Sequence, residues 1–145
     1  MGNSIICVEQ YGSVTFTADK LNYPTYVIES IYNTDPNYDY GLLTKLKTKL
    51  LTAKLTISEF VLTFTDVGQV YVFGDSANPL SSQTIVKVVE SKDAECDGQG
   101  RWPATATNLN DLGIGPNYRQ MNNLSGWTYM ISPLFVAGAF GLLFW

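Results

Sequence analysis

The last 19 residues of the chain carry no charged side chain. This segment, Trp127–Trp145, has the sequence WTYMISPLFVAGAFGLLFW, and no Asp, Glu, Lys or Arg follows Arg119. As an α-helix it would be roughly 28 Å long, which is close to the thickness of the hydrocarbon core of a bilayer. The segment therefore predicts a C-terminal transmembrane helix at residues 127–145. A buried core helix and a hydrophobic C-terminal strand are the alternative interpretations.

The ends and one face of this segment support the membrane interpretation. Trp127 and Trp145 stand where an interfacial aromatic belt would place them. Ala137 and Gly141 are small residues one helical turn apart, and they predict a face on which another helix packs. Because no Lys or Arg follows the segment, we expect a fragment of a longer protein rather than a complete tail-anchored one, and orientation is not predicted. Residues 1–10 do not resemble a signal peptide, so secretion would need an upstream sequence or the membrane helix itself.

Short segments rich in β-branched and aromatic residues fill the first part of the chain and predict a β-sandwich domain at residues 1–90. Residues 59–65 alternate aromatic and aliphatic side chains with others, so one face of this strand is apolar. Asp66-Val67-Gly68 then predicts a turn into residues 69–74, as the second arm of a hairpin. The other expected strands are Ser4–Glu9, Gly12–Thr17, Thr25–Ile31 and Gln83–Glu90.

One amphipathic helix is predicted at residues 40–54. Its leucines recur at helical spacing, and its four lysines lie mainly on other faces. We expect it to pack on the sandwich, and a basic helix on a membrane surface is the alternative. Residues 91–126 are rich in Asn, Gly and Asp and predict a polar, extended connector, with a short helical turn at residues 108–112. The expected order is therefore sandwich, connector and transmembrane helix.

Composition excludes several functions. The sequence has no histidine, so it cannot form a Ser-His-Asp triad, a Cys-His dyad or a His-ligated metal site. Its 9 basic residues and net charge of −4 argue against nucleic-acid binding, which needs clustered Lys and Arg. An enzyme would have to rely on carboxylates such as Asp66 and Asp75, and only their nearness to turns favours that. We expect no enzymatic activity.

Two patterns involve possible cross-links or ligands. Residues 93–98 begin like a calcium loop, but Ala104 stands where the bidentate Glu should be, so a solvated acidic loop is expected. Cys7 and Cys96 are the only cysteines. In an oxidising compartment they could form a disulfide that ties the connector to the domain. Two free thiols are the alternative, and the sequence leaves both open.

Residues 60–79, FVLTFTDVGQVYVFGDSANP, resemble the last hairpin of the cupredoxin family and the ligand loop after it. In blue copper proteins that loop starts with the copper-binding Cys and has a His three positions on. Here Asp75 and Asn78 hold those positions, so no type 1 copper site can form. Together with the tyrosine-rich residues 33–41, the pattern is similar to copper-free cupredoxin-like domains of large eukaryotic extracellular membrane proteins. The resemblance covers residues 4–90 and implies a Greek-key β-sandwich.

The sequence thus favours a non-catalytic structural or interaction module. We expect it to be tethered to a membrane and displayed on the extracellular or luminal side, without metal or other cofactor. The expected partners are other subunits or domains of the same assembly and the lipid bilayer, rather than nucleic acid or a small-molecule substrate. The alternative is an accessory subunit of a large membrane complex in an organelle or a virion.

Overall fold

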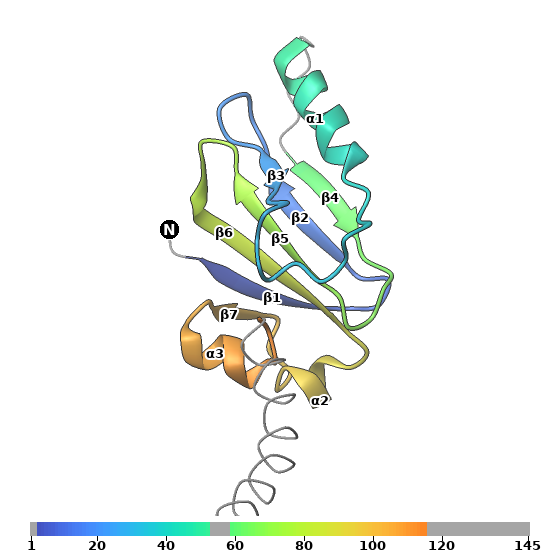
Figure 1. Ribbon diagram of the computed structural model, residues 1–145. Helices are drawn as coiled ribbons and strands as arrows, with labels where there is room; N and C mark the ends of the chain where they lie inside the picture. Colours follow the sequence, from blue (N-terminus) through green and yellow to red (C-terminus); the bar gives the residue numbers. More distant parts are fainter. Residues whose placement is uncertain (1–2, 53–58, 116–145) are drawn as a thin grey trace, which may run out of the picture.

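The structure is a computed structural model that describes residues 3–52 and 59–115. Over these ranges the chain is mainly β, with few helices, and its two packed sheets fit a β-sandwich (Figure 1). The strands are β1 (Ser4–Glu9), β2 (Ser13–Thr17), β3 (Pro24–Tyr26), β4 (Glu59–Thr63), β5 (Val70–Asp75), β6 (Asn78–Val89) and β7 (Arg101–Pro103). The helices are α1 (Gly41–Thr52), α2 (Lys92–Glu95) and α3 (Ala106–Asp111).

The larger sheet has five strands in the order β3-β5-β6-β1-β7. β1 runs parallel to β6, with Ile5 opposite Ile85 and Val8 opposite Val88, and the other neighbours are antiparallel. The strand predicted at residues 4–9 is confirmed with the same bounds. The one predicted at residues 83–90 is the second part of the longer β6.

The central strands of the larger sheet bury side chains on both faces, which explains their nearly continuous apolar sequences. We call the two buried clusters the inner core, which lies between the sheets, and the outer core, which lies on the far side of the larger sheet. The inner core is made by Val8, Val14, Leu43, Leu62, Phe64, Tyr71, Phe73, Val86 and Val88. The outer core is made by Ile5, Cys7, Val70, Val72, Ile85, Val89, Cys96, Leu112 and Ile114.

The second sheet consists of β2 and β4, and it corrects the expected hairpin. β4 pairs with β2, whereas β5 pairs with β3 and β6, so the hairpin predicted from residues 59–74 is wrong. The turn at residues 66–68 crosses from one sheet to the other. On its two sides, Phe64 and Tyr71 both enter the inner core, with ring centroids 5.3 Å apart. Two apolar strand faces can be buried side by side or face to face, and the sequence pattern is the same for both.

α1 packs at one end of the sandwich, as expected from its leucines (Figure 1). Leu46 and Leu50 are buried against Ala18. Leu42 and Leu51 belong to the same predicted apolar pattern but are exposed, so the buried face is narrower than predicted. Residues 53 and 54, the last of the predicted helix, lie outside the described residues.

The strand predicted at residues 25–31 is much shorter than expected, because β3 ends at Tyr26. The chain continues as a loop that Asn33 fastens to β5. The side-chain amide of Asn33 donates to the Val27 carbonyl (2.6 Å), and its Oδ1 accepts the backbone N–H of Val72 (2.8 Å). The Thr34 N–H donates to the Val70 carbonyl (3.1 Å). Residues 27–34 therefore cover the part of β5 that β3 leaves unpaired.

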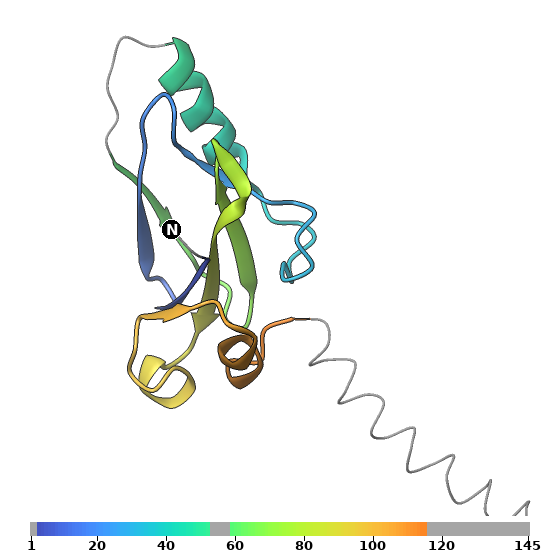
Figure 2. The same ribbon diagram turned by 90° about the vertical axis from the view of Figure 1, so that its left-hand side faces the viewer.

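Residues 91–115 differ from the expected polar connector. β7 joins the edge of the larger sheet, where Trp102 lies opposite Ile5. Leu112 and Ile114 are buried in the outer core, and α2 and α3 lie beside β7 at the end opposite α1 (Figures 1 and 2). These residues are part of the folded domain because few but well-spaced apolar side chains anchor a largely polar segment. The rest of the predicted connector, residues 116–126, lies outside the described residues.

Candidate functional site

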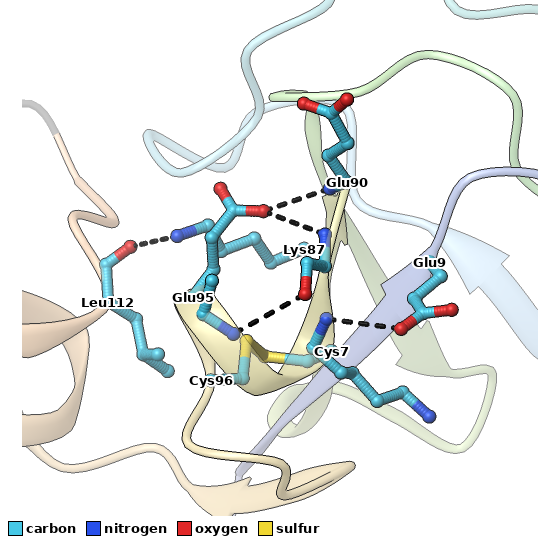
Figure 3. Close-up of a disulfide and its surroundings, with 10 residues drawn as sticks. Cys7, Glu9, Lys87, Glu90, Glu95, Cys96 and Leu112 are labelled. Atoms are coloured by element: carbon cyan, nitrogen blue, oxygen red, sulfur yellow. Dashed lines mark hydrogen bonds between the residues drawn. A yellow bond between two sulfur atoms is a disulfide. The ribbon is translucent and has the colours of Figure 1, made fainter.

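Cys7 and Cys96 are joined by a disulfide in the structure, which is one of the two states that the sequence left open (Figure 3). Cys7 lies on β1 and faces the outer core, and Cys96 follows α2; both side chains are almost fully buried. The bridge spans 89 residues of sequence, with the Cα atoms 6.6 Å apart. It fastens the segment after β6 to the N-terminal strand.

Hydrogen bonds reinforce this attachment. The Glu95 carboxylate accepts the backbone N–H groups of Glu90 (2.9 Å) and Ser91 (3.3 Å). The Glu9 carboxylate on β1 accepts the N–H of Lys92 (3.1 Å). Carboxylates that accept backbone N–H groups make strong, charge-assisted bonds. Figure 3 shows that the carboxylates of Glu9 and Glu95 are occupied with the backbone around the bridge, so the acidic segment that begins like a calcium loop serves a structural purpose.

Asp75 and Asn78 lie opposite one another across a two-residue turn between β5 and β6. Asp75 Oδ1 accepts the N–H of Ala77 (3.1 Å) within the turn. The next residue, Ser76, is bonded to a neighbouring loop, because its N–H donates to the Tyr23 carbonyl and its hydroxyl accepts the Tyr23 N–H. Asp75 and Asn78, which the hairpin resemblance aligned with copper ligands, therefore close a tight turn. Within residues 3–52 and 59–115, no group of three or more His, Cys, Asp and Glu is arranged to hold a metal ion.

Four tyrosines cluster at one side of the inner core. Tyr38 lies 4.5 Å from Tyr71 and 4.8 Å from Tyr26 by ring centroids, and Tyr40 stacks on Tyr26 at 5.4 Å. Burial raises the pKa of Tyr38 and of Tyr71 to about 12, and nearby carboxylates, Asp35 among them, add to the effect. The phenols of Tyr38 and Tyr71 therefore stay neutral at physiological pH, and the cluster packs the residue 33–41 segment against the sandwich rather than supplying a base.

An open groove with a volume of about 590 Å³ lies beside the loop after β3. It is lined by residues 25–31, which run from the end of β3 into the loop, and by Pro79, Leu80 and Gln83 of β6. Ile28, Ile31 and Leu80 line the groove and are strongly exposed, and Glu29 is the one charged residue of the lining. We call it the aliphatic groove, defined by these three aliphatic residues. Grouped exposed aliphatic side chains of this kind indicate a contact surface.

Sequence analysis did not single out the aliphatic groove. Ile28 and Ile31 belong to an expected strand, in which half-buried aliphatic residues are ordinary. Leu80 is distant from them in sequence, so the pattern gives no sign that it lies nearby. Two features of the sequence could have indicated that this segment is not a strand: the spacing of the two isoleucines and the lack of β-branched alternation after Tyr26.

The expected helix-packing pair, Ala137 and Gly141, and the predicted transmembrane helix at residues 127–145 lie outside the described residues. Among the helices of the described part, none is long and apolar enough to cross a membrane.

Comparison with known proteins gives no relative for this chain. No protein-family model, no curated protein and no solved structure matches it.

Proposed function

We propose that the chain is a non-catalytic interaction module, tethered to a membrane by residues 127–145 and displayed on the extracellular or luminal side. The observation that carries the proposal is the buried Cys7–Cys96 disulfide. Protein disulfides persist mainly in oxidising compartments, whereas cytosolic thiols are kept reduced. The partners of the module are other subunits or domains of its assembly and the bilayer.

The described residues offer contact surface rather than catalytic geometry. The carboxylates near the bridge accept backbone hydrogen bonds, Asp75 closes a turn, and burial raises the pKa of Tyr38 and of Tyr71. The aliphatic groove brings three exposed aliphatic side chains from two segments to one open cavity. These features support a binding role over an enzymatic one.

The cupredoxin-like Greek-key form of the sandwich belongs to the same proposal. Its support is the pair of packed sheets and the position of Asp75 and Asn78 in the turn between β5 and β6. The hairpin resemblance itself is not part of that support, because β4 and β5 pair in different sheets. Metal analysis of the purified protein tests the copper-free part of the proposal: we expect no bound copper, and stoichiometric copper would contradict it.

Vesicle flotation tests the membrane tether. The full chain should float with phosphatidylcholine vesicles, and Leu134→Arg combined with Leu142→Arg should abolish flotation, because charges are costly at the centre of a bilayer. The matched control places two arginines on exposed positions of α3, Ala106→Arg and Asn110→Arg, and should float like the wild type. Equal flotation of both double variants would overturn the tether.

A further inference from the structure

The aliphatic groove exposes all three of its defining side chains by more than half. Ile28 is 59% exposed, Ile31 is 66% exposed and Leu80 is 78% exposed. They come from two separate segments and line one open cavity. Isolated exposed aliphatic residues are normal on protein surfaces, whereas a contiguous group requires a partner that takes it out of water.

The described chain ends next to the loop that contributes Ile28 and Ile31 to this groove. Gly115, the last described residue, lies against Tyr32: a Cβ atom on Gly115 would be 3.3 Å from the Tyr32 ring. Tyr32 directly follows Ile31 in the loop. Figure 2 shows the loop after β3 and the end of the described chain on the same side of the larger sheet. Gly115 therefore lies on the same side of the larger sheet as the loop that lines the aliphatic groove.

The apolar segment begins a short way along the chain from Gly115. Residues 116–126 separate Gly115 from Trp127, and 11 residues span at most about 40 Å when fully extended. If residues 127–145 lie in a bilayer, Gly115 is held within that distance of the membrane surface. A tether of this length gives the groove an effective concentration on the order of millimolar at that surface.

We propose that the aliphatic groove rests on the bilayer that holds residues 127–145, with Ile28, Ile31 and Leu80 entering the boundary between headgroups and acyl chains. This inference rests on the proposed membrane tether. Three aliphatic side chains give only weak, reversible membrane binding by themselves, and the tether makes that contact persistent. The lining has Glu29 and no Lys or Arg, so the contact does not depend on attraction to anionic lipid headgroups. The outer-core side of the larger sheet then faces the membrane, and the small sheet of β2 and β4 faces away.

Val61 provides a matched control. It lies on β4 in the small sheet, between Phe60 and Leu62, whose side chains point inward, and it is 53% exposed. It is therefore a β-branched aliphatic residue with nearly the exposure of Ile28 on the opposite side of the sandwich. The proposal places Ile28 in lipid and leaves Val61 in water.

The experiment uses the full chain in phosphatidylcholine nanodiscs, with a fluorophore attached at Ile28→Cys, Leu80→Cys or Val61→Cys under non-reducing conditions. Lipids with nitroxide headgroups should quench the fluorophore at positions 28 and 80 at least threefold more than at position 61. Equal quenching at all three positions would overturn the proposal. Failure of the wild-type chain to float with vesicles would instead overturn the tether. The failure of the groove proposal and the failure of the tether are therefore distinguishable.

A label-free measurement guards against effects of the fluorophore. For the wild type, amide hydrogen exchange in residues 27–31 should be several-fold slower in nanodiscs than without lipid. The variant that combines Ile28→Ser, Ile31→Ser and Leu80→Ser should lose this protection. Val61→Ser should retain the protection. Protection that requires another protein of the assembly, and is absent in pure lipid, would contradict a lipid-facing groove and assign the surface to a protein partner.

Discussion

At the scale of single residues, two cysteines and a small set of tyrosines determine how the domain is held together. Cys7 sits in a core strand that the sequence already predicts, whereas Cys96 lies in a polar segment that was expected to stand apart from the domain. The pairing could not be decided from sequence because two cysteines 89 residues apart carry no information about their distance in space. The bridge brings a segment with few apolar residues into the core.

Removing the bridge should destabilise the domain. We expect Cys7→Ala combined with Cys96→Ala to lower the free energy of unfolding by roughly 2–5 kcal/mol, because the unfolded chain regains the freedom that the cross-link removes. Urea unfolding monitored by circular dichroism measures this. The reduced wild type should match the double variant. A double variant as stable as the oxidised protein would show that the bridge contributes nothing.

The tyrosine cluster predicts a loss of stability in alkali. In the folded state the pKa values of Tyr38 and Tyr71 are about 12, above the ordinary value of 10.0 that they take when the chain unfolds. Between these pH values the unfolded chain binds fewer protons than the folded one, so raising the pH favours unfolding. Stability should fall from about pH 10 to pH 12. Tyr38→Phe should make this decline shallower, as measured by urea unfolding across the pH series. An unchanged slope in the variant, after correction for its stability at pH 7, would contradict the assignment.

At the scale of elements, local sequence patterns predicted individual strands and helices but could not predict which strands pair. The strand at residues 4–9 and the helix near residues 41–52 follow from periodicity that is contained within each segment. The failed hairpin between β4 and β5 has a physical reason: strand pairing is non-local, and Phe64 and Tyr71 are buried equally well face to face across the inner core. The aliphatic groove was missed for the same reason, because its sides come from residues that are adjacent only after folding.

Two leucines of α1 test the observed helix face. Leu46 is 3% exposed and Leu42 is 58% exposed, although both fit the apolar pattern of the sequence. Leu46→Ala should lower the free energy of unfolding by roughly 2–5 kcal/mol through lost burial and a cavity. Leu42→Ala should change it by no more than about 0.5 kcal/mol, as is usual for surface substitutions. Denaturant unfolding of the two variants gives both values, and equal losses would mean that the helix packs through a different face.

At the scale of the whole molecule, a disulfide-bonded sandwich is followed by an apolar segment, residues 127–145, that we propose as a membrane tether. The density of β-branched and aromatic residues predicted the β-rich class. The domain was expected to end at residue 90, which is too early. Residues 101–114 contribute a sheet strand and two outer-core side chains, and their polar composition concealed this. Gly115, the last described residue, lies beside Tyr32, and the proposed tether would place this side of the domain toward the membrane.

The central claim is that the module works in an oxidising compartment with its bridge intact. Intact mass spectrometry after thiol alkylation, on protein purified from its native membranes without reductant, tests this most directly. The account predicts no alkylation before reduction and two alkyl groups after it, at Cys7 and Cys96. Two alkyl groups before reduction would mean free thiols in the native protein and would contradict both the bridge and the display outside the cytosol.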